Sequence, residues 1–117
     1  MVGTVAPTLL VHGLFSLMPK DSSVINISGT FENGAKGWLP YFVSKKGIEA
    51  LTIGLSQELV SKDVKVNCIS PSDVATEEYK KYFPEDALNA LTPQDVAGAV
   101  VEIVNSEKNG EILILKK

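Results

Sequence analysis

The stretch that decides the fold is residues 41–59, YFVSKKGIEALTIGLSQEL. Its aliphatic residues recur at steps of three and four, which is the spacing of one face of a helix. They are Ile48, Leu51, Leu55 and Leu59. Pro40 directly precedes the stretch and disfavours helical geometry in the residue ahead of it, so the helix is predicted to begin near Tyr41.

Two glycines lie on another face of this predicted helix. Gly47 and Gly54 are seven residues apart, and each costs roughly 1 kcal/mol of helix stability relative to alanine. We therefore expect a neighbouring backbone to approach this face closely.

A tyrosine and a lysine stand one helical turn apart at the start of the stretch. Tyr41 and Lys45 share a helix face, because residues four apart are neighbours on a helix surface. A fixed ammonium group favours the ionised form of a nearby phenol, which makes tyrosine a more useful general acid and base. In a chain with three tyrosines and eleven lysines, such a pair is by itself a weak motif, and the rest of the sequence must decide its meaning.

One helix and one strand are predicted before the stretch. Residues 4–18 are largely apolar, with Pro7 in the first turn and Pro19 at the end, and we interpret them as a buried helix. The alternative, a targeting segment, lacks a basic start and small residues after it. His12, the single histidine, is expected to pack or to face solvent rather than to bind a ligand. Residues 23–28, SVINIS, predict a buried strand.

The segments on either side of the next strand are polar or rich in glycine. Residues 29–40 form a glycine-rich loop with Trp38, and such loops bind ligands when they follow parallel strands. The loop matches neither of the common phosphate-binding glycine motifs. Residues 64–70, VKVNCIS, predict a strand that Pro71 ends, with Cys68 as a small core residue. Residues 77–91 predict a polar connection, in which residues 85–91 form a short helix.

The last part of the chain predicts a helix and a strand. Thr92 and Pro93 are typical of a helix start, and residues 111–115, EILIL, predict a final strand. The order of helix and strand then alternates along the whole chain. This alternation predicts an α/β fold with a parallel sheet and right-handed crossovers.

The composition excludes several classes of protein. We interpret residues 1–117 as a single domain with one core. The net charge of −3 gives no electrostatic reason to expect a nucleic acid or an anionic membrane as partner. The chain has no arginine, and its one cysteine allows no internal disulfide and no cysteine-rich metal site. We expect no metal centre and a cytoplasmic location.

Four segments together resemble the carboxyl-terminal half of the short-chain dehydrogenase/reductase family. Residues 24–28 (VINIS) resemble the strand that carries the family's serine, and residues 41–45 (YFVSK) its Tyr-x-x-x-Lys motif. Residues 64–76 (VKVNCISPSDVAT) resemble the family segment with Val-Asn, Pro-Gly and Val-x-Thr. Residues 92–97 (TPQDVA) resemble the start of its last helix. The resemblance covers essentially the whole chain, in the family's order and spacing.

The resemblance implies a set of site residues. Tyr41 would be the general acid and base, Lys45 would activate Tyr41 and hold the nicotinamide ribose, and Ser28 would polarise the substrate carbonyl. Pro71, Val74 and Thr76, together with Tyr41 and Lys45, would contact the cofactor, NAD or NADP. Trp38 and residues 77–91 would border the substrate.

Two departures concern single positions. The family usually has two serines at this place, and the second is the catalytic one. An alternative alignment would set that second serine at Gly29, with Thr30 as a distant substitute. The spacing of 13 residues between positions 28 and 41 favours Ser28 instead. The family's Pro-Gly is Pro71-Ser72 here, so a local difference in the loop is expected, because serine adopts positive φ less readily than glycine.

The largest departure concerns the cofactor. The resemblance implies a partial Rossmann-like, three-layer fold in which the amino-terminal, cofactor-binding half is missing; residues 1–4 resemble a family segment that follows a catalytic asparagine. We expect an NAD(P)-dependent oxidoreductase acting on a carbonyl or alcohol, in a truncated form that is inactive alone and binds no cofactor by itself. The alternative is a non-catalytic oligomerising scaffold. Expected partners are copies of the chain or a chain that supplies the missing half, because a bare sheet edge favours pairing.

Overall fold

The computed structural model describes residues 2–31 and 34–117. Met1, and residues 32 and 33 within the predicted 29–40 loop, lie outside the described residues. The helices are α1 (Val2–Leu14), α2 (Leu39–Glu58), α3 (Glu77–Tyr82) and α4 (Pro93–Val104), and the strands are β1 (Ser23–Ile27), β2 (Lys65–Pro71) and β3 (Ile112–Leu115). Shorter 3-10 turns are η1 (Phe15–Leu17), η2 (Val60–Lys62) and η3 (Asp86–Asn89).

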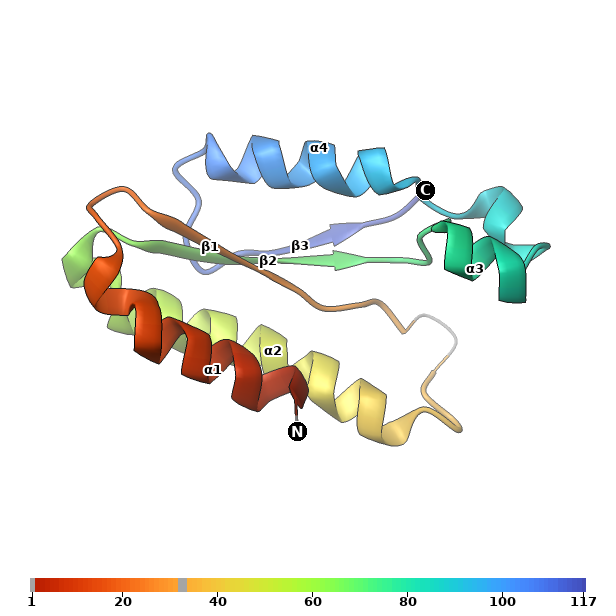
Figure 1. The fold of residues 1–117 in the computed structure, drawn as a ribbon, viewed down its shortest axis with the longest axis horizontal. Helices are drawn as coiled ribbons and strands as arrows, with labels where there is room; N and C mark the ends of the chain where they lie inside the picture. Colours follow the sequence, from red (N-terminus) through yellow and green to blue (C-terminus); the bar gives the residue numbers. More distant parts are fainter. Residues whose placement is uncertain (1, 32–33) are drawn as a thin grey trace.

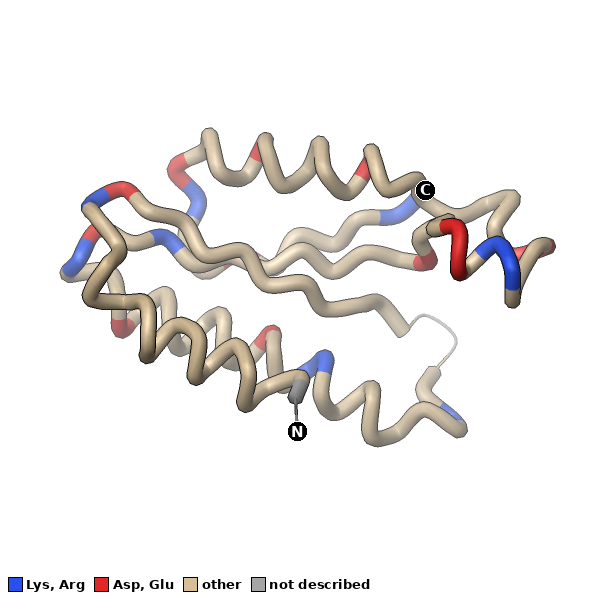
Figure 2. Tube along the Cα trace, in the orientation of Figure 1, with Lys and Arg blue, Asp and Glu red and all other residues tan. Residues whose placement is uncertain are grey.

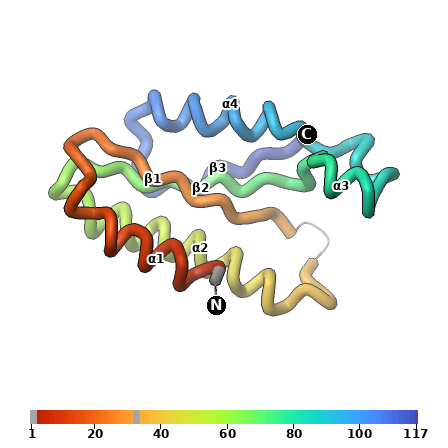
Figure 3. The backbone as a smooth tube through the Cα atoms, viewed as in Figure 1, coloured from red at the N-terminus to blue at the C-terminus, as the bar shows by residue number. Residues whose placement is uncertain are grey.

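The three strands form one parallel sheet in the order β1-β2-β3, as the alternation of elements predicts (Figure 1). Ser23 pairs with Lys65 at the start of β1, and Cys68 pairs with Ile112 in β3. Because the strands are parallel, their carboxyl ends lie at one end of the molecule, where α2 begins and α3 lies (Figure 3).

The helices cover the sheet in two layers. Figure 1 shows α1 and α2 on one face of the sheet and α4 on the other. The first face holds a core of Val11, Leu59, Val64 and Val66, against which Leu55 packs. The second face holds a core of Ile69, Ala99 and Ile103. Side chains of a strand alternate between faces, so Val66 and Ile69, an odd number of residues apart, serve different layers.

The helix of the decisive stretch begins earlier than predicted. α2 starts at Leu39, with Pro40 inside its first turn. Proline is tolerated there because the first N–H groups of a helix have no partner within the helix. The predicted stripe does face inward in part: Ile48 and Leu59 are buried, and Leu51 and Leu55 are half-buried.

The sequence prediction for α1 is wrong in two respects. Pro7 lies inside the helix and not in its first turn, because the helix already includes Val2. The helix is also not buried: Leu10 of α1 is 61% exposed and Leu17 of η1 is 75% exposed, and among the described side chains of α1 only Val11 is buried in the core. An apolar stripe in the sequence shows which side chains favour burial, but it does not show whether another element buries them. Within the described residues, α1 packs mainly on α2. His12 is exposed, in line with one of its two predicted roles.

At Gly47 a neighbouring helix does approach α2 closely, but the atoms nearest this glycine belong to a side chain and not to the predicted backbone. A Cβ atom on Gly47 would lie 2.5 Å from the Thr4 side chain of α1, and a Cβ on Gly3 would clash with Ser44 of α2. Glycines on both helices therefore allow α1 and α2 to approach closely. At Gly54 the prediction is wrong, because a Cβ there would meet nothing within 4 Å among the described residues.

The segment between β2 and α4 contains more helix than predicted. α3 begins directly after Thr76, whose hydroxyl accepts a hydrogen bond from the Tyr79 N–H at 3.1 Å, and η3 follows in place of the predicted 85–91 helix. The segment closes on itself, since the Ala75 N–H donates to the Leu91 carbonyl at 2.7 Å. This closed segment forms the outer wall beside the carboxyl end of β2 (Figure 1).

Candidate active site

A cleft of about 650 Å³ opens at the carboxyl ends of β1 and β2. The end of β1 contributes Ser28, the first turns of α2 contribute Tyr41 and Lys45, and β2 with the following loop contributes Pro71 and Val74. The structure therefore brings five of the six predicted site residues to one cleft. These residues come from three separate segments of the chain.

Ser28 has a buried hydroxyl group without a hydrogen-bond partner among the described residues. Its backbone N–H donates to the Ile69 carbonyl at 2.9 Å, which extends the pairing of β1 with β2 and fixes the residue. Ser28 is one of the residues that line the cleft and is only 4% exposed. Its Oγ is itself buried, has no hydrogen bond of normal geometry among the described residues, and lies near the Cys68 thiol, whose pKa it lowers against the larger effect of burial. Buried hydroxyls in proteins are normally paired, so an orphaned one in a cleft is a candidate for contact with a ligand.

Tyr41 and Lys45 lie side by side on the first turns of α2. The Lys45 Nζ is 5.4 Å from the centre of the Tyr41 ring, and it donates a hydrogen bond to the Ile27 carbonyl at 3.3 Å. Lys45 thus connects α2 to the residue directly before Ser28. The Tyr41 ring is 51% exposed, so its phenol remains accessible from the cleft.

The predicted cofactor residues separate into two groups. Pro71 and Val74 line the cleft, and the Pro71 carbonyl accepts a hydrogen bond from the Thr30 N–H at 3.1 Å. Thr76 does not line the cleft, because its side chain caps α3.

The two departures from the family pattern leave the cleft intact. Ser72 has a negative φ, since Asp21 and Asp63 are the two described non-glycine residues with positive φ. Gly29 and Thr30 also line the cleft beside Ser28. The alternative serine position therefore lies at the same cleft, and Ser28 is the residue there with a buried hydroxyl.

Three polar residues line the α3 side of the cleft: Asp73, Tyr79 and Asp86. The resemblance implied that residues 77–91, which include Tyr79 and Asp86, border the substrate, but it gave them no individual role, and Asp73 was missed. Burial raises the pKa of Tyr79 to about 12, with further contributions from its hydrogen bond to Asp73 and from the charges of Asp73 and Asp86. The Tyr79 ring also lies 5.2 Å from that of Phe83. Asp73 could have been noticed because it lies in the 64–76 segment that resembles the family. Its proximity to Tyr79 and Asp86 could not be predicted, because it depends on how the chain turns through α3.

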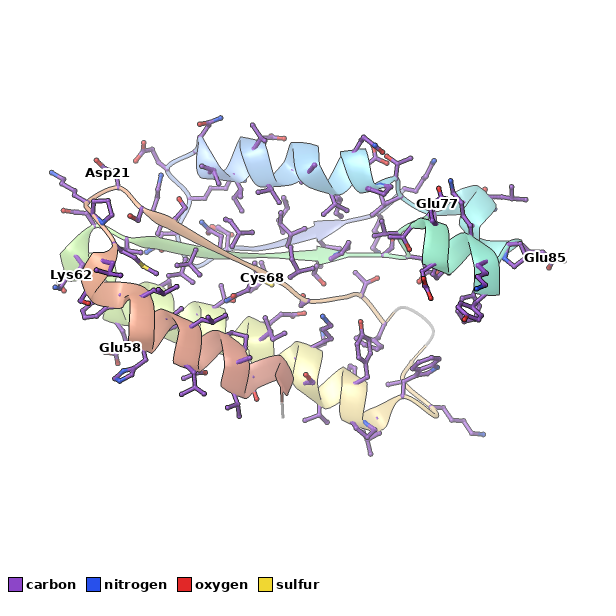
Figure 4. All side chains as sticks on the ribbon, in the orientation of Figure 1. Asp21, Glu58, Lys62, Cys68, Glu77 and Glu85 are labelled. Carbon is purple, nitrogen blue, oxygen red and sulfur yellow. The ribbon has the colours of Figure 1, made fainter. Side chains whose placement is uncertain are left out.

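Other kinds of site are not seen in the described residues. No group of three or more potential metal ligands occurs there, and none of the helices is long and apolar enough to cross a bilayer. Cys68 is fully buried, and burial raises the pKa of its thiol. Figure 4 shows its position in the middle of the sheet, well inside the molecule.

Comparison with known proteins agrees with the resemblance of the motifs. A family model described as enoyl-(acyl carrier protein) reductase matches residues 2–110. An uncharacterized oxidoreductase of Staphylococcus aureus is 38% identical over 103 residues, which are 88% of this chain and 42% of the relative.

Solved structures share the fold. A short chain dehydrogenase from Salmonella enterica serovar Typhi matches 97% of this chain with a TM-score of 0.79 and 24% identity. A blue fluorescent protein from a metagenomic library, solved in complex with NADPH, matches 98% with a TM-score of 0.86 and 20% identity. The chain covers 49% and 52% of these two structures, respectively, and thus about half of their length. By its sequence match and its fold, the chain belongs to the short-chain dehydrogenase/reductase family.

Proposed function

We propose that this chain supplies the proton-transfer and substrate-binding groups of an NAD(P)-dependent oxidoreductase that interconverts a carbonyl and an alcohol. One observation carries the proposal: Ser28, whose buried hydroxyl has no hydrogen-bond partner among the described residues, lines the same cleft as Tyr41 and Lys45. Three polar groups from two separate elements thus converge where a substrate oxygen can reach them.

Each group has a distinct proposed role. The Ser28 hydroxyl donates a hydrogen bond to the substrate oxygen and holds it in place. The Tyr41 phenol gives a proton to that oxygen during reduction and removes it during oxidation. The Lys45 ammonium group, 5.4 Å from the Tyr41 ring centre, stabilises the phenolate that remains after the proton has left.

The residues fit the nicotinamide end of the cofactor. Only one hydrogen bond of the Lys45 ammonium group is accounted for by the Ile27 carbonyl, so further donors can reach a ribose hydroxyl, and Pro71 and Val74 offer an apolar wall to the ring. When bound, the cofactor supplies or accepts the hydride. Thr76 remains a proposed cofactor contact only if the loop between β2 and α3 rearranges, since its hydroxyl now caps α3.

Recognition of a carbonyl by the cleft can be tested without any cofactor. Cyclohexanone titrated into the protein is expected to shift the NMR signal of the Trp38 indole, because Trp38 lines the cleft and is the single tryptophan. Ser28→Ala and Tyr41→Phe should each weaken binding several-fold. The matched controls Ser61→Ala and Tyr82→Phe remove the same groups outside the cleft lining and should change nothing. Equal binding by all four variants would refute the proposal.

The cofactor and the catalytic activity need a separate experiment. The sequence has neither an arginine nor a glycine-rich phosphate motif, so we expect the 117-residue chain alone to show no turnover with NADH or NADPH. Titration of both nucleotides, followed by calorimetry and by Trp38 fluorescence, should show no saturable binding. Turnover that disappears in Tyr41→Phe would overturn this expectation while supporting the catalytic roles.

Association with a second chain is part of the proposal. The apolar side chains that α1 leaves exposed include Leu9, Leu10 and Leu14, and exposed apolar side chains of this kind favour a partner surface. We expect light scattering at micromolar concentration to show an oligomer that Leu10→Lys disrupts. Leu88→Lys, at an exposed leucine of η3, is the control. A stable monomer would contradict this part of the proposal.

The same exposed face favours the second candidate function, a non-catalytic oligomerising scaffold. That function is indicated if the protein self-associates but the cleft binds no ketone. A cytoplasmic location belongs to either proposal, because the lone Cys68 is a buried free thiol, which suits a reducing compartment.

A further inference from the structure

The α3 side of the cleft has a different charge from its α2 side. On the α2 side, Lys45 lies beneath Tyr41 and donates to the end of β1. On the α3 side the two charged residues that line the cleft, Asp73 and Asp86, are both acidic. Figure 2 shows both acidic and basic positions along the segment between β2 and α4, the basic ones being Lys80 and Lys81 of α3. Lys116 and Lys117 line an adjoining hollow that Asp73 and Asp86 also border. Within the lining of the cleft itself, the charged residues are basic near the proposed reacting oxygen and acidic at the other side.

Tyr79 lies beside one of these carboxylates. Burial, with a further contribution from the neighbouring Asp73 carboxylate, raises the pKa of its phenol to about 12, and its ring packs against Phe83, 5.2 Å away between ring centres. A tyrosine hydroxyl is protonated at neutral pH, so it can donate a hydrogen bond to this carboxylate. Asp73 is further fixed through its carbonyl, which accepts from the Leu91 N–H at 2.8 Å. We call Asp73, Tyr79 and Asp86 the acidic wall.

We propose that the acidic wall makes the cleft select carbonyl or alcohol substrates whose far end donates hydrogen bonds and carries no negative charge. This inference rests on the proposed function, because it assumes that Ser28 and Tyr41 hold the other end of the substrate. The shared chemistry is found in polyhydroxylated compounds and in amino-substituted ones. Substrates with a carboxylate or phosphate at the far end are excluded.

Two features of the cleft support this choice. Ionised carboxylates only accept hydrogen bonds, so hydroxyl and ammonium groups pair with them and anions do not. The buried Ser28 hydroxyl, without a partner among the described residues, is an independent sign that the cleft receives a polar ligand. A substrate held there by its carbonyl oxygen would extend past Trp38 and Phe31, which also line the cleft.

The test uses cyclohexanones that differ only in the group across the ring from the carbonyl: a hydroxyl, an amino group or a carboxylate. Binding is followed by the NMR shift of the Trp38 indole, which requires no turnover. A unit charge about 6 Å from a carboxylate in watery surroundings changes affinity roughly threefold, so two carboxylates give about tenfold. We expect the amino ketone to bind at least tenfold more tightly than the carboxylate at low salt, with the hydroxyl ketone between them.

Charge-neutral variants identify the cause. Asp73→Asn combined with Asp86→Asn should reduce the amino-to-carboxylate preference to less than threefold. Glu85→Gln is the matched control, because Glu85 borders an adjoining hollow and not this cleft, and it points outward in Figure 4. Tyr79→Phe should act in the opposite direction, since it frees the Asp73 carboxylate to bind the ligand. Folding of every variant is checked from the same NMR spectra.

The outcomes separate this inference from the proposed function. If none of the ketones binds the folded wild type, the proposed function fails and the inference fails with it. If all three bind equally, or if the double variant keeps the preference, the acidic wall has no selective role while the proposed function stands. A preference for the amino ketone that falls steeply with salt identifies the ammonium group as the favoured end. A preference for the hydroxyl ketone that persists in salt identifies a polyhydroxylated substrate.

Discussion

Replacing Thr52 by valine is expected to destabilise the protein by removing a side-chain hydrogen bond between β1 and α2. Thr52 is fully buried, and its Oγ1 accepts a hydrogen bond from the Asn26 amide at 3.0 Å while donating to the Ile48 carbonyl at 2.8 Å. This is the hydrogen bond between side chains that links the strand carrying Ser28 to the helix carrying Tyr41. Its strength therefore bears on the geometry of the cleft.

The magnitude follows from what the substitution leaves behind. Valine has nearly the shape of threonine, so no cavity forms, but the Asn26 amide loses its acceptor. A donor left unpaired in a protein interior costs about 1–3 kcal/mol. Asn26 is only half-buried, and water can replace part of the lost hydrogen bond, so we expect a loss of about 1 kcal/mol in the free energy of unfolding. For a chain of this size, that corresponds to a decrease of about 4 °C in Tm.

Urea unfolding followed by Trp38 fluorescence and circular dichroism measures the loss. A double-mutant cycle with Asn26→Ala isolates the hydrogen bond from other effects of either substitution. The expected coupling energy is about 1 kcal/mol, and Thr52→Ser, which keeps the hydroxyl, should retain it. If the effects of Thr52→Val and Asn26→Ala add to within about 0.3 kcal/mol, the hydrogen bond does not hold the two elements together.

Three further predictions concern single groups. Thr92→Ala removes the hydroxyl that caps α4 and accepts from the Asp95 N–H, so unfolding free energy should fall by about 1 kcal/mol, measured by urea unfolding. The backbone N–H of Thr92 donates to the Asp95 carboxylate at 2.8 Å and, with a smaller contribution from the Thr92 side chain, lowers the pKa of Asp95. The stabilisation should be lost as the pH falls through that lowered value, and pH-dependent melting of Thr92→Ala should show a slightly weaker loss, because alanine keeps the backbone donor. Cys68 should react with a thiol reagent only after unfolding, because it is buried and its pKa is raised; fast labelling of the native protein would contradict this. The difference in ultraviolet absorbance between wild type and Tyr79→Phe should change near pH 12, where the Tyr79 phenol ionises, and Asp73→Asn should lower that pH. The free energy of unfolding that Tyr79 contributes is present below about pH 10 and is lost as the pH rises towards 12.

The elements that could be predicted are those with strong local signals. The strands at 23–28, 64–70 and 111–115 were recognised from short apolar runs between turn residues, and all three are confirmed within one or two residues. α4 was recognised from Thr92 and Pro93, and the structure shows a full capping box between Thr92 and Asp95. Such signals depend on hydrogen bonds within four residues, so they survive without knowledge of the rest of the chain.

α3 was missed for the converse reason. Its six residues contain no apolar stripe, and its formation depends on the Thr76 cap and on the closure of the segment between Asp73 and Leu91. Val74 pairs with Leu91, which is far from it in the sequence, and a local sequence pattern does not predict such a pairing. The acidic wall was not recognised as a cluster, although residues 77–91 were expected to border the substrate, because its members meet only when the turn through α3 brings them to one side of the cleft.

By itself, the sequence determined the α/β class and the parallel order of the elements, because periodicity is a property of the chain alone. Its resemblance to a known family singled out Ser28, Tyr41 and Lys45 as the proposed site residues. The tertiary structure decided three other matters. It showed that the Ser28 hydroxyl is buried without a partner among the described residues, that α1 leaves its leucines exposed, and that the α3 side of the cleft is acidic. Burial, solvent exposure and the summed field of distant charges depend on which segments meet in space, and a linear pattern does not contain that information.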